Sequence, residues 1–379
     1  MRALGRATWA LLSLGAGLGL AVVAFALAVY SAGNGGPPAE ALDRSRPANA
    51  LALAVMGDSD SHSYQDRLAF PPGSDARGGD SRARTFNWVE TLARLRASEL
   101  DPGPWLAWGS GGRMSSVRRI FGLPVGRVPT KEDFLHNFSY SGARCDDLMA
   151  GPFRQAPWLA ALMQKEPERW RNGIVVIRMG LNDMQSMLDL QASEPDAPRI
   201  NEAISRCQSR IAEAIAQLRE RQPGLKFLIV GMGNEIDDPG QFESYRSAEE
   251  VNNTDEAMER FNGALRDLAE RTPGAAFFDQ DAWFRQRWGS RSADGLPDTY
   301  KTVTIGDSFK VTNTAGDDPH NALLNDHHAG TVWNALWAQS IVLRLREAFA
   351  LPLTPIGDDE LWRYVGPLVR PHRLKAPGS

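Results

Sequence analysis

The chain has 379 residues, of which 42% are hydrophobic and 23% are charged, and its formal net charge is -4 at pH 7. A disordered chain would be poorer in apolar residues and further from neutrality, and a polytopic membrane protein would exceed a mean hydropathy of -0.34. The sequence pI near 5.9 argues against nucleic-acid binding, which usually needs a basic face. We therefore expect a folded protein without nucleic acid among its partners.

The N-terminal segment indicates the compartment. Arg2 and Arg6 precede an uncharged, mostly apolar run over residues 9–32, which is long enough to span a bilayer, since about 20 apolar residues suffice. We expect an uncleaved signal anchor and transmembrane helix over 1–32, with the two arginines in the cytoplasm. The Gly-, Pro- and Ala-rich residues 33–50 predict a flexible linker, and the rest of the chain then lies in the periplasm or at the cell surface. Cleavage at the end of the apolar run is the alternative, and it would give a secreted protein.

Beyond the linker, apolar runs alternate with amphipathic patterns. Short continuous apolar runs predict buried strands, and apolar residues at spacings of three and four predict helices. The expected strands are LALAVM (51–56), GIVVIRMG (173–180), KFLIVGMG (226–233) and AAFFD (275–279), and the expected helices cover 85–100, 201–221, 257–274 and 331–349. This alternation is typical of a parallel sheet covered by helices on both faces.

We expect one catalytic domain over residues 51–350, followed by a C-terminal tail over 351–379. Within the domain, 281–327 lacks the strand–helix alternation and predicts an insertion or lid that contains a β-hairpin. The hairpin turn is a Gly-Asp-Ser triplet between alternating flanks, so Ser308 is expected to be a turn residue. The acidic segment 233–256 is expected to be a solvated loop, with a calcium site as the alternative.

The chain contains two cysteines, Cys145 and Cys207. One disulfide is open to a protein that folds outside the cytoplasm, and two buried free thiols are an equally acceptable reading. Neither cysteine lies in a Cys/His pattern with zinc spacing. We therefore expect no metal and no other cofactor.

A second Gly-Asp-Ser triplet occurs in MGDSDSHSYQD (56–66), directly after the first expected strand. Ligand sites in parallel sheets lie beyond the carboxyl ends of the strands, so Ser59 is a candidate nucleophile. Such a serine needs a histidine base that a carboxylate orients. Asp58 and His62 flank Ser59, and a helical turn there would place His62 on the same side, so both are candidate pocket residues.

Two more motifs follow expected strands. In MGLND (179–183), the amide of Asn182 can donate an N–H to an oxyanion, as a carboxylate cannot. In SYSGARCDDL (139–148), Gly142 offers a backbone N–H without side-chain crowding. Asp183 is a further candidate pocket residue. The alternatives are a helix N-cap at 182–183 and a plain strand-to-helix turn at Gly142.

The fourth motif is LLNDHHAGTVWN (323–334), just before the last expected helix. Together and in this order, the four motifs resemble the SGNH (GDSL-type) hydrolase family over about residues 50–349. The resemblance implies a flavodoxin-like three-layer α/β/α sandwich with a central parallel sheet, and ester hydrolysis without a metal. It also implies that Ser59 is the nucleophile and that the N–H groups of Ser59, Gly142 and Asn182 form the oxyanion hole.

The sequence departs from the family in its last motif. The family usually carries D-x-x-H, but Asn325 stands three residues before His328 and Asp326 only two before it. We favour His328 as the base, because the family's base lies just before the final long helix, and Asp326 as its partner. Orientation by Asn325, or a pair made of Asp317 and His320 at the usual spacing, stays open.

We therefore expect a membrane-anchored, extracytoplasmic serine esterase that acts through a Ser-His-Asp triad and an acyl-enzyme. Its substrate would be a small-molecule, glycan or lipid ester. Two alternatives stay open. The same site could transfer the acyl group to a hydroxyl of an envelope glycan, or the domain could be a catalytically inactive relative that binds such a glycan.

Overall fold

A computed structural model describes most of the chain after the predicted linker. The described residues are 49–109, 117, 120–121, 129–291 and 300–370. The predicted anchor and nearly all of the predicted linker lie outside these ranges. Within them, no helix combines the length and the apolar character needed to cross a membrane.

The centre of the fold is a five-stranded parallel sheet with the strand order β2-β1-β5-β6-β7. This is the 2-1-3-4-5 order of flavodoxin-like folds. Val55 pairs with Val176, which pairs with Leu228 on its other side. The strands are β1 (Leu51–Gly57), β2 (Leu100–Asp101), β5 (Ile174–Arg178), β6 (Lys226–Val230) and β7 (Ala275–Phe278).

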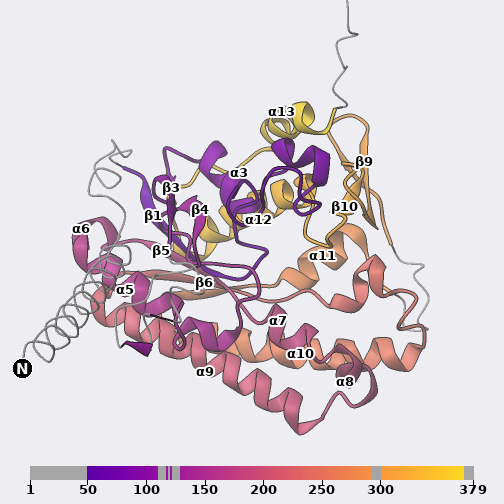
Figure 1. Cartoon of the computed structure of the whole chain (residues 1–379), viewed down its shortest axis with the longest axis horizontal. Helices are drawn as coiled ribbons and strands as arrows, with labels where there is room; N and C mark the ends of the chain where they lie inside the picture. The colour runs from indigo at the N-terminus through magenta and orange to yellow at the C-terminus, as the bar shows by residue number, and fades with distance from the viewer. Residues whose placement is uncertain (1–48, 110–116, 118–119, 122–128, 292–299, 371–379) are drawn as a thin grey trace, which may run out of the picture.

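Helices cover both faces of this sheet (Figure 1). One face carries α5 (Gln155–Lys165), α9 (Pro198–Arg221) and α10 (Ala248–Arg271), and the other carries α3 (Trp88–Leu95), α11 (Gln280–Trp288), α12 (Thr331–Phe349) and α13 (Asp358–Val369). Successive strand residues point to opposite faces, so Met56 packs in the first core and Val55 in the second. The predicted α/β/α layering with a central parallel sheet is confirmed.

Shorter elements connect the layers. Residues 136–140 run beside β1, where the Val55 N–H donates to the His136 carbonyl (3.1 Å) and the Phe138 N–H donates to the Val55 carbonyl (2.8 Å). The other elements are β3 (Trp105–Trp108), β4 (Lys131–Phe134), α6 (Pro167–Trp170), α7 (Leu181–Gln185), α8 (Leu188–Ser193) and 3-10 turns at 79–84, 145–148, 235–237 and 239–241.

The predicted hairpin is present as β8 (Val303–Ile305) and β9 (Phe309–Ala315), which are antiparallel, and β10 (Asn321–Leu323) then pairs with β9 in parallel. Ile305 pairs with Phe309, so residues 306–308 form the connecting turn. Gly306 has φ +60°, a conformation that glycine adopts without steric cost. The assignment of Ser308 to a turn is confirmed.

Two segments are more ordered than the sequence suggested. The predicted C-terminal tail contains α13, which buries Leu361, Val365 and Val369 in the core above the sheet. The acidic segment expected to be a solvated loop already starts α10 at Ala248, because Ser247 and Glu250 form a capping box there. Periodicity alone located the helix but missed the cap that begins it.

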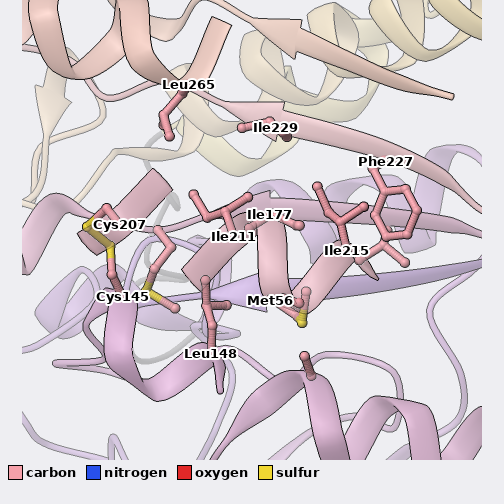
Figure 2. Packing of buried hydrophobic residues seen from close by; sticks show 14 of the residues in the cluster. Met56, Cys145, Leu148, Ile177, Cys207, Ile211, Ile215, Phe227, Ile229 and Leu265 are labelled. Atoms are coloured by element: carbon pink, nitrogen blue, oxygen red, sulfur yellow. A yellow bond between two sulfur atoms is a disulfide. The ribbon is translucent and has the colours of Figure 1, made fainter. Parts of the chain in front are cut away.

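The two cysteines form a disulfide, and both are fully buried. The bond joins the 3-10 turn at 145–148 to the middle of α9, next to Leu148 and Ile211 (Figure 2). Of the two readings of the cysteines, the bridge is the one that the structure shows. It fixes the loop that follows Gly142 to one of the two long helices on this face of the sheet.

Candidate active site

A pocket of about 210 Å³ opens at the carboxyl ends of the sheet strands. Ser59, Asn182, Asp326 and His328 all contribute to its lining, although they come from three distant segments of the sequence. The other lining residues are Asp60, Trp88, Arg178, Leu181, Gln185, Gly233, Asn234, Glu235, Asp237, Asp238, Gln280, Phe284, Asn313, Leu323, His327, Ala329, Trp333, Asn334 and Trp337. The parallel sheet thus gathers three of the four predicted motifs at one point, as the topological rule for such sheets predicts.

The end of β1 positions Ser59. The backbone of Gly57 exchanges two hydrogen bonds with the buried amide of Gln155, at 2.8 and 2.9 Å. A side chain at Gly57 would lie 2.7 Å from the carbonyl oxygen of Arg178, so only glycine fits where β1 and β5 end side by side. Ser59 itself is 9% exposed; it follows this anchored strand end and lines the pocket.

The short Asp-His-His motif brings its two functional side chains together through a backbone bend. His327 has φ +63°, a left-handed conformation that non-glycine residues rarely adopt. The bend places Asp326 Oδ1 3.3 Å from His328 Nδ1, and the Asp326 carbonyl oxygen lies 3.0 Å from the same nitrogen. A carboxylate two residues before the histidine can therefore reach the ring.

The oxyanion candidates occupy two neighbouring loops. Asn182, at the start of α7, donates from its amide to the carbonyl of Ala143 (2.9 Å). An amide group has two N–H donors, so one is left for the pocket that Asn182 lines. Gly142 is exposed, has φ +81° and lies just outside the pocket lining, next to the carbonyl that Asn182 binds.

Three predicted pocket residues have other surroundings. His62 is buried between Asp66 (Nε2 to Oδ2, 2.7 Å) and the Phe70 ring (5.1 Å between centroids), so it braces the loop after β1. Asp183 accepts the N–H of Cys145 (2.9 Å) and so caps the turn beside the disulfide. Asp58, next to Ser59 in the chain, is fully buried. None of the three lines the pocket.

The alternative base lies elsewhere. His320 is exposed, its ring stacks on Phe309 (4.2 Å), and its Nδ1 lies 2.6 Å from the carbonyl oxygen of Lys310. Asp317 accepts the backbone N–H of Asn325 (3.1 Å), and Asn325 is exposed. Hence the structure brings His328 and Asp326 to the pocket of Ser59 and does not bring His320, Asp317 or Asn325 there.

Paired charges flank Ser59, the candidate nucleophile. Arg178, the last residue of β5, contacts Asp60 (2.6 Å) and Asp58 (3.2 Å). Burial raises the pKa of Asp58 to about 6, against the charge of Arg178. Burial also acts to raise the pKa of Asp60, but the charges of Arg178 and His328 outweigh it and hold that pKa below its usual range. Sequence reasoning missed Arg178, although a charged residue that ends a buried strand is itself a signal.

An acidic wall forms another side of the pocket. Glu235, Asp237 and Asp238 come from the segment after β6 that the sequence suggested was a solvated loop. Burial, together with the charges of Asp238 and Asp60, raises the pKa of Glu235 to about 8. This shift favours the neutral carboxylic acid, which can donate a hydrogen bond into the pocket.

Another part of the pocket lining is aromatic. Phe284 on α11 and Trp333 on α12 stack with ring centroids 4.9 Å apart, and both line the pocket. The predicted insertion thus contributes to the site through its first helix. Within the described part of the chain, the one cluster of donor atoms with metal-like proximity is Cys145, Asp183 and Cys207. Its two sulfurs are bonded to each other, so we assign no metal there.

The fold and the pocket define the class of the protein. It is an α/β sandwich with a buried serine, a histidine–aspartate pair and an amide donor at the carboxyl ends of its parallel strands. The family model of the GDSL-like Lipase/Acylhydrolase family matches residues 108–302. The chain belongs to this family, as the motifs predicted, and it is an ester-bond hydrolase. The matched range includes Gly142 and Asn182 and excludes Ser59 and His328.

Several solved structures match this chain at low identity. The lipase Lip_vut3 from a goat rumen metagenome is 15% identical, with 65% of this chain and 90% of that chain covered and a TM-score of 0.34. An extracellular lipase from Streptomyces rimosus is 13% identical, with coverage of 65% and 86% and a TM-score of 0.35. A mutant acetyl-xylooligosaccharide esterase from Geobacillus stearothermophilus is 14% identical, with coverage of 80% and 97% and a TM-score of 0.36. Among curated proteins, none matches this chain.

Proposed function

We propose that the protein is a membrane-anchored, extracytoplasmic serine esterase whose triad is Ser59, His328 and Asp326. One observation carries this proposal. The serine and the histidine–aspartate pair come from opposite ends of the domain and line the same pocket, at the strand ends where such sheets bind ligands. Family membership supplies the ester chemistry, and the pocket supplies the residues.

The reaction follows from these groups. His328 takes the hydroxyl proton of Ser59 as Oγ attacks the ester carbonyl. The oxyanion that forms accepts hydrogen bonds from N–H groups of Asn182, Gly142 and Ser59. Collapse breaks the bond to the alcohol, which leaves with the proton from His328. Water then gives a proton to His328 and attacks the acyl-enzyme, and this releases the acid and restores Ser59. Asp326 stabilises the imidazolium in both steps.

The two Gly-Asp-Ser triplets of this chain provide a matched test. A fluorophosphonate probe should label Ser59, and Ser59→Ala should abolish both labelling and hydrolysis of p-nitrophenyl acetate. Ser308→Ala should retain both, because Ser308 lies in the hairpin turn and does not line the pocket. Labelling that survives Ser59→Ala refutes the assignment of the nucleophile. Absence of labelling and turnover in the folded parent would favour the inactive glycan-binding alternative.

The location is a second part of the proposal. The disulfide supports folding outside the cytoplasm, because reducing compartments keep most thiols free. The apolar run over 9–32 supports an anchor. The protein should fractionate with membranes, and proteolysis within 33–50 should release a soluble, active fragment. A mature protein that is soluble and begins near residue 32 would show that the segment is a cleaved signal peptide.

A further inference from the structure

Arg77 lies directly behind the histidine–aspartate pair. Its Nη1 is 2.6 Å from Asp326 Oδ2 and 2.8 Å from His328 Nδ1, and its backbone N–H donates to the same carboxylate oxygen at 3.0 Å. Arg77 is 3% exposed and does not line the pocket. The guanidinium thus touches both members of the pair on the side away from the substrate.

The loop between β1 and α3 holds the backbone of Arg77 in a strained, left-handed conformation. Arg77 has φ +60°, and such a conformation in a non-glycine residue persists only where the surroundings enforce it. Its guanidinium lies over the rings of Phe70 (4.3 Å) and Tyr64 (5.1 Å). Tyr64 in turn donates its hydroxyl to the carbonyl of Ala329, the residue after His328 (3.1 Å). A strained backbone and a buried cation therefore occur together at one residue whose charged group reaches the base.

We propose that Arg77 is a positioning residue for ester hydrolysis, which fixes the Asp326 carboxylate beside the ring of His328. The inference rests on the proposed function, in which His328 is the base. Arg77 acts through that pair and contacts no substrate.

The two oxygens of the Asp326 carboxylate have different partners, and this explains how Arg77 can orient the carboxylate. Arg77 binds Oδ2 and leaves Oδ1 facing His328 Nδ1, at the longer distance of 3.3 Å. A motif with two-residue spacing has less backbone support for this geometry than D-x-x-H, so a second element must orient the carboxylate. Two hydrogen bonds from Arg77, one of them from its backbone, do so.

The contacts of His328 Nδ1 with Arg77 and Asp326 depend on which ring nitrogen carries the proton. A guanidinium only donates hydrogen bonds, so Nδ1 accepts from Arg77 when the ring proton is on Nε2, and donates to Asp326 when the proton is on Nδ1. The charged groups around His328 are Arg77, Asp326 and, from the loop after β1, Asp58 and Asp60. Catalysis needs the second arrangement, in which Nε2 is free to take the serine proton, and a fixed Asp326 makes it available.

Arg77→Gly in the full-length enzyme tests this role, because glycine adopts φ +60° without strain and leaves space for a free guanidinium ion. The matched control is Arg82→Ala. Arg82 donates to the carbonyls of Tyr64 (3.1 Å) and Asp66 (2.6 Å) in the same loop and has no contact with the pair. Kinetics with p-nitrophenyl acetate are measured with guanidinium chloride at low, non-denaturing concentration and with matched sodium chloride.

We expect Arg77→Gly to lower kcat by roughly 10–100-fold, the size of loss seen when hydrogen-bond partners that orient metal-binding histidines are removed, with KM nearly unchanged. Guanidinium should restore several-fold of the lost rate, and it should not change Arg82→Ala. A parent-like kcat in Arg77→Gly, or a loss of kcat that guanidinium does not restore in folded protein, overturns the inference. Fluorophosphonate labelling of the parent separates the failures: an unlabelled Ser59 refutes the proposed function, whereas a labelled Ser59 with a parent-like Arg77→Gly refutes only the role of Arg77.

Discussion

Loss of the Cys145–Cys207 disulfide should destabilise the protein strongly. The cysteines are 62 residues apart, and in the chain-entropy description the closure of a loop of this length stabilises the folded state by about 4 kcal/mol. The double variant Cys145→Ala/Cys207→Ala removes the bond without leaving a free thiol. Both positions are fully buried, so alanine avoids the burial of an unpaired polar group.

Urea unfolding followed by tryptophan fluorescence measures the difference. We expect the free energy of unfolding to fall by about 2–5 kcal/mol, and dithiothreitol should destabilise the parent while leaving the double variant unchanged. The bond also anchors the loop whose Ala143 carbonyl binds Asn182, so labelling of Ser59 should slow in folded double variant. A loss of stability below about 1 kcal/mol would refute the loop-closure reasoning.

Two further predictions concern the pocket. Asn182→Asp keeps the size of the side chain but cannot donate in its ionised form, so kcat should fall about 10²–10³-fold, as for loss of one oxyanion donor; steady-state kinetics with an unchanged KM checks this. For Glu235, the raised pKa of about 8 means that the folded state binds the proton more tightly than the unfolded state, where the ordinary value is 4.5. The resulting stability is present below pH 4.5 and is lost as pH rises towards 8. Glu235→Gln should therefore match the parent at pH 4 and exceed it at pH 9 by on the order of 1 kcal/mol, whereas Glu259→Gln, at an exposed site on α10, should show no such crossover.

The sheet could be predicted from the sequence because its signals are local. The runs at 51–56, 173–180 and 226–233 are continuous and apolar, and the structure shows them as β1, β5 and β6, buried on both faces. The order of the strands then places residues that follow them at a common edge. This is why Ser59 and Asn182, which are separated by more than a hundred residues, could be expected in one pocket.

The groups around those residues depend on tertiary contacts that no local pattern encodes. Arg77 lies in a loop rich in glycine and charge, and its contact with Asp326 joins positions 249 residues apart. Glu235 belongs to a segment whose composition is typical of a solvated loop. In the folded protein it lines the pocket, and burial raises its pKa. His62 shows the reverse case. Its position three residues after Ser59 predicted a place in the pocket, but its side chain is buried against Asp66 and Phe70 instead.

The final motif shows how a departure from a family pattern can be compensated in three dimensions. An aspartate two residues before a histidine ordinarily points away from the ring, and the left-handed backbone of His327 (φ +63°) turns it back. That conformation is held from outside the motif, because His327 Nδ1 lies 2.8 Å from Asp238 Oδ1 and Arg77 binds Asp326. The short spacing is therefore not evidence of an inactive domain. Its geometry is supplied by two distant segments, and a change in either of them should disturb the position of His328 as directly as a change in the motif itself.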